Sequence, residues 1–506
     1  MSLTGCIGLK FELYPPVKLF RIIFFIAGVF STGVLHAQSG RPVTYTAEFG
    51  GLYSLNNRAP FWIRSNQFGI VPDSGNTFFF RHGIYTKEDT SDRLVKLSAG
   101  LEMVTMVGEQ TRLMLPEAFV AARMGKFRLL AGRKKQVQGL GDTTLSSGSM
   151  TWSGNALPLP GIELSLPEYI NLANGFLGIK GHFTHAWFGD QTYVKGYYLH
   201  QKSLYARVGR PEGRVRLYGG VIHHVQWGGK PKYSVPEDRW LTINERFASG
   251  WNVYRDVVFP FHNPPRDSAK VASFDFENRY GNHLGQVDIG GELDMGSYRW
   301  LFYKQLPFET GQTFSSLGNL DDGVYGISLA SRKPEGWFRR MVVEFVHTTN
   351  QGMYRSGLLR LLGYHGRHYG RNQNFYFSHS QYVDGWSYEG KTLGSPFLIP
   401  NPEIRDEKSI DASNYFANNN NIKAGYVGLL TQLSGVKMET RVSFSKNFGS
   451  SANILPETAN QLSFAHRMTL PLPEEGGFIQ LHVGIDQGDL IRDNYGIMLS
   501  WKKVWE

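Results

Sequence analysis

The stretch YGIMLSWKKVW, residues 495–505, alternates between large apolar side chains and small or polar ones. One face, interrupted only by Lys503, carries Tyr495, Ile497, Leu499, Trp501 and Trp505. The opposite face carries Gly496, Met498, Ser500 and Lys502. Because successive side chains of a β-strand point to opposite sides, this period of two predicts a strand with one apolar face. Aromatic residues at both ends of such a strand are typical of the girdles of a membrane barrel.

Roughly 18–19 segments with strand-like patterns run from Val43 onward, and an even number favours about 18 strands. After the segment at 176–189, the next predicted strand begins only at Ser203. The composition agrees, with 58 glycines, 25 tyrosines, 34 phenylalanines, one cysteine and a mean hydropathy of −0.29. Short connections such as 211–213 and 434–435 alternate with long ones such as 133–159. We also expect a tight hairpin at 108–110. These features predict an all-β, transmembrane antiparallel β-barrel with long outer loops and short helical inserts; a soluble all-β protein is the alternative.

The N-terminal residues 1–37 are typical of a secretory signal peptide. Lys10, Lys18 and Arg21 precede an apolar run from 22 to 35, and Ala37 supplies the small residue before a cleavage site. Cys6 precedes the apolar run, so it does not fit a lipoprotein cleavage box. We therefore expect residues 38–506 to form one cysteine-free barrel domain in the outer membrane of a Gram-negative bacterium, which excludes a disulfide or a thiolate nucleophile.

Two long inserts, about 228–270 and 349–419, interrupt the strands. In the first, a capping box at 234–237 precedes apolar residues at spacings of three and four, which predicts a short helix broken near Gly250. The apolar positions are Trp240, Ile243, Phe247, Trp251, Tyr254 and Val258. An earlier polar connection, 54–76, contains the pair Phe61-Trp62, which we expect to be exposed.

Within the second insert, residues 363–390 read GYHGRHYGRNQNFYFSHSQYVDGWSYEG. Aromatic rings stack on sugar C–H faces, and amide or guanidinium groups bond hydroxyls and carboxylates. This pattern predicts a polysaccharide-binding surface formed or supported by Arg371, Asn374, Tyr376, His379, Tyr382, Trp386 and Tyr388. The alternative is that these residues pack a long loop into its own small core, as loops beyond roughly 12–15 residues commonly require.

The sequence offers little for catalysis, metals or cofactors. His365, His368 and His379 sit among glycines without a cysteine to complete a zinc site. Ser378-His379 is a common neighbour pair and makes no triad by itself. The acid pairs 321–322 and 474–475 read as turns rather than as glycosidase carboxylates. Asp384 and Glu389 are the only suggestive candidates for glycoside cleavage, and solvated loop acids are the favoured interpretation there. We therefore expect no catalytic residue, no metal and no cofactor.

Several motifs, taken in order, resemble the Wzi-type capsule assembly family. They are FDFENRYGNHLG at 274–285, Tyr303-Lys304-Gln305, Leu320-Asp321-Asp322-Gly323, Gly326, the 372–390 stretch, and Gly394-Ser395-Pro396. The later motifs are the more specific, and the N-terminal third matches mainly in pattern. The resemblance implies a large outer-membrane barrel that retains capsular polysaccharide as a lectin rather than as an enzyme.

A basic chain, with a formal net charge of +10, suits lipid phosphates and acidic polysaccharide. No nucleic-acid module is present. The expected partners are capsular or exopolysaccharide, outer-membrane lipids and polysaccharide export machinery, with the barrel as a monomer. The alternative function is an outer-membrane porin or solute transporter, because strand count does not reveal whether loops plug the lumen.

Overall fold

The computed structural model describes residues 43–505, apart from 73, 88, 90–91, 110, 234–238, 261–269, 353–355, 359–361, 364–373, 405–418, 451–453 and 474–475. The expected signal segment, the capping box at 234–237 and Arg371 lie outside this part. Among the described residues, no helix is both long and apolar enough to cross a membrane.

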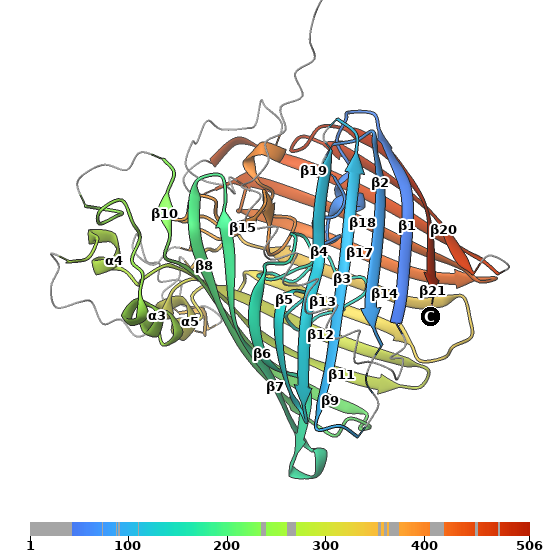
Figure 1. Cartoon of the computed structure of the whole chain (residues 1–506), viewed down its shortest axis with the longest axis horizontal. Coiled ribbons are helices and arrows are strands. Elements are labelled where there is room, and N and C mark those ends of the chain that lie inside the picture. The colour runs from blue at the N-terminus through green and yellow to red at the C-terminus, as the bar shows by residue number, and fades with distance from the viewer. Residues whose placement is uncertain are drawn as a thin grey trace, which may run out of the picture.

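The chain forms a closed antiparallel β-barrel, as predicted (Figure 1). Eighteen strands make the wall, each pairing with the next, and the first pairs with the last, Phe49 lying opposite Trp501. They are β1 (Val43–Ser54), β2 (Thr77–Thr86), β3 (Val95–Val107), β4 (Arg112–Met124), β5 (Phe127–Arg133), β6 (Gly161–Leu172), β7 (Leu177–Asp190), β8 (Val194–Val208), β9 (Val215–Trp227), β11 (Asn282–Met295), β12 (Tyr298–Phe308), β13 (Gly323–Ser331), β14 (Phe338–His347), β17 (Ile422–Leu433), β18 (Val436–Gly449), β19 (Ile454–Leu472), β20 (Gly477–Gly488) and β21 (Asn494–Trp505). Closure leaves no unpaired edge, which lipid would not tolerate.

The outer surface of the wall is apolar, because the outward positions of the strands carry exposed aliphatic and aromatic side chains. In β21 the exposed residues include Tyr495, Ile497, Leu499 and Trp505, the face that the alternation predicted. Exposed aromatic side chains also gather toward the strand ends at both rims, as interfacial girdles do. Those near one rim are Tyr53, Phe78, Trp187, Tyr325 and Tyr495; those near the other are Tyr45, Phe127, Tyr298, Trp337 and Trp505.

The two rims differ in their connections. One rim carries both ends of the wall, Val43 and Trp505, and connections such as 125–126, 296–297 and 434–435. The other rim, called the mouth below, carries the long connections 55–76, 134–160, 228–281, 309–322 and 348–421. The short turn at 108–111 also belongs to the mouth, so short and long connections are not fully sorted between the rims.

The insert after β9 is less helical than predicted. Its helix α3 (Trp251–Val258) begins only after Gly250, whose φ is 100°. Residues 240–247 do not form a helix, because Asn244 and Glu245 adopt left-handed conformations and Ile243 bridges to Arg246. A second short helix, α4 (Ser273–Glu277), follows, and α5 (Gly311–Ser316) lies in the next mouth connection. In Figure 1 these three helices lie together at the left, away from the C-terminus.

Helix α3 packs on the outside of the barrel wall, against the mouth ends of β8 and β9. Val257 lies in a buried cluster with Val225 and Trp227, and Tyr254 packs on the Trp227 ring at 5.2 Å between centroids. Lys202 donates to the carbonyl oxygen of Val258 at the helix C-terminus. The helix therefore covers polar side chains of the outer wall. The first half of β8 was not predicted as a strand. One of its faces is covered by α3 and the other packs against a cluster in the lumen, so its residues do not alternate between apolar and polar.

Candidate functional site

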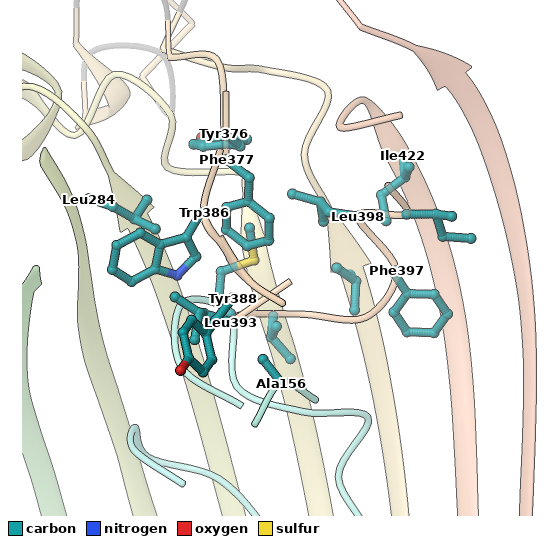
Figure 2. Close-up of a cluster of buried hydrophobic side chains, with 14 of the residues drawn as sticks. Ala156, Leu284, Tyr376, Phe377, Trp386, Tyr388, Leu393, Phe397, Leu398 and Ile422 are labelled. Carbon is teal, nitrogen blue, oxygen red and sulfur yellow. The ribbon is translucent and has the colours of Figure 1, made fainter. Parts of the chain in front are cut away.

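Three segments from the mouth fold into the barrel lumen, and we call them together the plug: residues 56–72, 134–160 and 374–404. Their apolar side chains form one buried cluster with inward-facing wall residues. Figure 2 shows the part of this cluster that contains Tyr376, Phe377, Trp386, Tyr388, Leu393 and Phe397, beside Leu284 and Ile422 of the wall. The plug also contains the short helix α2 (Phe61–Arg64) and the hairpin of β15 (Ser387–Tyr388) and β16 (Lys391–Thr392).

Hydrogen bonds join the three plug segments. The Ser153 N–H donates to Leu393 O at 2.7 Å, and the Ser395 N–H donates to Met150 O at 3.0 Å. The Trp386 indole Nε1 donates to Thr151 O at 2.7 Å. The Phe68 N–H donates to Gly154 O at 2.5 Å. The segments are thus one folded unit, although more than 200 residues separate the second from the third.

Polar side chains of the wall anchor the plug by accepting from its backbone. Gln305 Oε1 accepts from Met150 N at 2.8 Å, Glu344 Oε2 from Ser147 N at 2.6 Å, and Asp288 Oδ2 from Leu140 N at 2.8 Å. Gln286 Oε1 accepts from Thr151 N at 3.0 Å. A buried loop needs partners for its backbone polar groups, and the lumenal faces of β11, β12 and β14 supply them.

Five of the seven predicted binding residues are buried in this plug. Their exposed fractions are 0% for Asn374, Tyr376 and Trp386, 1% for Tyr382 and 3% for Tyr388. Tyr376 OH donates to Asp322 Oδ2 at 2.6 Å, and Arg133 Nη2 donates to Tyr388 OH at 2.6 Å. The rings therefore form no exposed platform in this structure, and the packing alternative describes their placement. A supporting role in binding stays a prediction.

His379, the sixth of these residues, is half-buried at the contact between the plug and α4. Its ring lies edge-on to Phe274 at 5.3 Å, and its Nδ1 accepts from Gln381 N at 3.2 Å. Gln381 Nε2 in turn donates to Asp275 Oδ1 at 3.1 Å. Burial raises the pKa of Asp275 to about 7, because the one side-chain hydrogen bond does not replace the lost hydration.

Two carboxylates that sequence reasoning read as loop or turn acids organise the plug. Asp322 is fully buried and accepts from Asn350 N at 2.9 Å and Gln351 N at 2.7 Å as well as from Tyr376. Asp384 accepts from Val194 N at 2.7 Å, which ties the plug to the start of β8. The expected exposure of Phe61-Trp62 was wrong: both rings are buried, and Trp62 Nε1 donates to Ser443 Oγ at 2.9 Å.

Two pockets open between the plug and the wall at the mouth, each of about 310 Å³. The first, called pocket A, is lined by Asn56, Asn57, Arg58, Ala59, Arg64, Pro402, Glu403, Ile404, Asp486, Ile491, Arg492 and Asn494. The second, pocket B, is lined by Asn57, Arg58, Gly69, Val71, Pro72, Ser74, Met106, Arg112, Met114 and Lys391. Sequence reasoning missed both, because their residues come from five or six separate segments and show no shared motif.

The described part of the chain contains no group of three His, Cys, Asp or Glu side chains placed to hold a metal ion. His365 and His368 lie outside that part. The two pockets at the mouth contain amide, guanidinium, ammonium and carboxylate groups.

Comparison with known proteins places the fold. No family model matches the sequence, and no curated protein matches it. Among solved structures, the chain is similar to Wzi of Escherichia coli, titled an outer membrane protein involved in group 1 capsule assembly and a carbohydrate-binding β-barrel. The identity is 12% and the TM-score 0.56, covering 94% of this chain and 87% of that one. OccAB2 of Acinetobacter baumannii matches at a TM-score of 0.45 with 8% identity, covering 92% of this chain and 99% of that one. The chain therefore has the fold of an outer-membrane β-barrel.

Proposed function

We propose that this barrel binds a surface polysaccharide of the capsular type and helps to assemble or retain it at the cell surface, without catalysing a reaction. The observation that carries the proposal is the plug: a folded unit occupies the lumen near the mouth, and two pockets lie on its outer edge. The motifs between 274 and 396 that resemble the Wzi-type family support the same function, as does the shared fold. Its partners would be the polymer, outer-membrane lipids and export machinery, with the barrel as a monomer.

Binding by weak contacts suits such a polymer. A repeating glycan presents the same group many times, so many barrels in one membrane can hold one chain together. Multivalent contacts raise the apparent affinity by about 10²–10⁴ without any single strong site. Because many barrels bind the same polymer chain, two small pockets at the mouth of each barrel are sufficient to retain it.

A second candidate is an outer-membrane porin or solute transporter, and the charged groups inside the lumen, from the wall and from Lys135 of the plug, favour it. Lys135 Nζ lies 2.6 Å from Glu102 Oε1, and Arg81 Nε lies 3.0 Å from the same carboxylate. Arg467 and Arg441 both pair with Glu439, at 2.5 and 2.9 Å. Polar lumens of this kind are typical of water-filled barrels.

The two candidates differ in what loss of the gene does. Deletion is followed by separate measurement of cell-bound and released polysaccharide. The proposal predicts that total polymer is unchanged while the bound share falls and the released share rises, and that the intact gene restores retention. Unchanged retention, together with a loss of uptake of a small solute, would reject the proposal in favour of the transporter.

A further inference from the structure

We infer that pockets A and B form one binding site for an anionic segment of the polysaccharide, with Arg58 at its centre. The inference rests on the proposed function and adds to it the location of the site and the chemical class of the ligand. Asn57 and Arg58 line both pockets, so the two cavities adjoin across this pair of residues. Specific small-ligand pockets measure about 300–1,000 Å³, and each of these reaches the lower end of that range.

Arg58 is held in place rather than extended into solvent. Its Nη1 donates to Glu403 O and its Nη2 to Pro402 O, both at 3.0 Å. Its own carbonyl oxygen accepts from the side chains of Ser54 and Asn494. The guanidinium between the pockets is therefore positioned before a ligand arrives, which lowers the entropic cost of binding.

Cationic side chains outnumber acids in the two pockets. Among the described lining residues, five are cationic and two are acidic. The cations are Arg58, Arg64, Arg112, Lys391 and Arg492, and the acids are Glu403 and Asp486. Four of the five cations are arginines, whose planar donors suit carboxylate and phosphate groups better than a lysine does.

The acids in and around the pockets already accept from the protein. Arg64 Nη2 lies 2.5 Å from Glu403 Oε2, and Asp486 Oδ2 accepts from Phe61 N at 2.8 Å. At the edge of pocket B, Glu389 pairs with Arg112, and Glu109 accepts from the side chain of Asn57. With Glu389 and Glu109 counted, the cations still outnumber the acids, by five to four, and Arg58 is the cation that both pockets share.

The other lining groups suit a sugar. Asn56 and Asn57 offer amides for hydroxyl groups in pocket A, whereas the Asn494 amide is buried and bonds Arg58 O and Ser54 Oγ. Ile404 and Ile491 give pocket A an aliphatic surface, and Val71 and Met114 do the same in pocket B. A sugar ring has apolar C–H faces and polar edges, and both kinds of group are present beside the cations. The site therefore matches an acidic glycan better than an inorganic ion.

The test measures equilibrium binding of the polysaccharide, purified from cells that make this protein, to the full-length barrel in detergent. Three forms of the polymer are compared: native, with carboxylates reduced to hydroxyls, and freed of phosphate with hydrofluoric acid. Four barrels are compared: wild type, Arg492→Gln, Arg492→Lys, and Arg332→Gln as a matched control. Arg332 lies at the opposite rim, 3.9 Å from Asp294, and touches neither pocket.

We expect the native polymer to bind, and one of the two treatments to weaken binding about tenfold or more, which identifies whether the site binds a carboxylate or a phosphate. Arg492→Gln weakens native binding severalfold, Arg492→Lys restores most of it, and Arg332→Gln has no effect. Equal binding of all three polymer forms, or no effect of Arg492→Gln beside a folded barrel, overturns this inference while the proposed function stands. Failure of every polymer to bind wild type overturns the proposed function itself.

Discussion

The buried segment 374–404 and the pockets beside Arg58 lie at the same mouth of the barrel, yet they differ in aromatic content and in how accessible their side chains are to a ligand. The segment is rich in aromatic rings, but its rings contact wall and plug residues, as Trp386 does at 0% exposure. The pockets have no aromatic lining among their described residues, but they are hollow and cationic. The difference supports our inference that the aromatic residues form a floor inside the barrel and that a ligand would meet the accessible charged groups rather than the rings.

The largest expected effect is in the floor. Trp386→Ala removes a fully buried indole, its hydrogen bond to Thr151 O and its contact with the His224 ring at 5.1 Å. Truncation of a buried tryptophan typically costs about 3–5 kcal/mol. We expect the plug to become sensitive to protease while the barrel still runs faster on gels unless boiled, because Trp386 belongs to no wall strand.

A matched control is Trp251→Ala in α3, where the ring is 78% exposed. An effect within about 0.5 kcal/mol is expected for such a surface change. A protease-resistant plug in Trp386→Ala, or equal effects of the two substitutions, would break the contrast between floor and surface.

A smaller effect is expected at Asp322, whose carboxylate accepts from two backbone donors of the connection 348–421 and from Tyr376 of the plug. Asp322→Asn keeps one acceptor oxygen and replaces the other with an NH2 group, so part of the set Asn350 N, Gln351 N and Tyr376 OH loses its acceptor. Leaving buried donors unsatisfied costs about 1–3 kcal/mol. Hydrogen exchange measures this as faster exchange at 350–351, with β1 and β21 at the far wall unchanged. If exchange at 350–351 is as slow in the Asp322 variant as in the wild type, another acceptor, such as a water molecule, replaces the carboxylate.

The contact between α4 and the plug is expected to depend on pH through Asp275. Burial raises the pKa of Asp275 from 3.8 to about 7, so the folded state holds a proton that the unfolded state has lost between these values. Stability of the contact therefore falls as pH rises through this window, by at most about 1.4 kcal/mol per pH unit. Asp275→Asn removes that slope. Hydrogen exchange of 273–277 from pH 4 to 8 checks it, and an unchanged slope in the variant would exclude Asp275.

The smallest effect on stability is expected at the pocket itself. Arg492 is exposed, so Arg492→Gln should change unfolding by no more than about 0.5 kcal/mol. Retention of polymer by whole cells should nonetheless fall. A variant that is equally stable and retains polymer normally would move the ligand site away from Arg492.

The wall could be predicted because lipid on one side and polar groups on the other impose a period of two, as in 495–505. The prediction was weakest where both faces are covered, as in residues 194–202 of β8. The helix in 228–270 was predicted too long, because apolar spacing does not reveal the left-handed turn at Asn244 and Glu245.

The site was harder to predict than the wall. An aromatic and amide-rich loop has the same composition whether it packs or binds, so Trp386 and Tyr376 were assigned to a binding surface that this structure does not expose. Arg58, Arg112 and Arg492 come together only after the barrel closes β1 against β21. Long-range pairing of this kind leaves no local pattern. The stretch around Arg58 was noted only as a polar connection.

If the plug closes the lumen to ions, the barrel is suited to binding rather than to transport, and single-channel recording in planar bilayers distinguishes the two. We expect no large, steady conductance steps from the whole protein, and we expect such steps from a variant in which residues 374–404 are replaced by a short glycine-serine linker. The polar wall beneath the plug would then line an open path. Large, steady steps from the intact protein would contradict the account and favour the transporter.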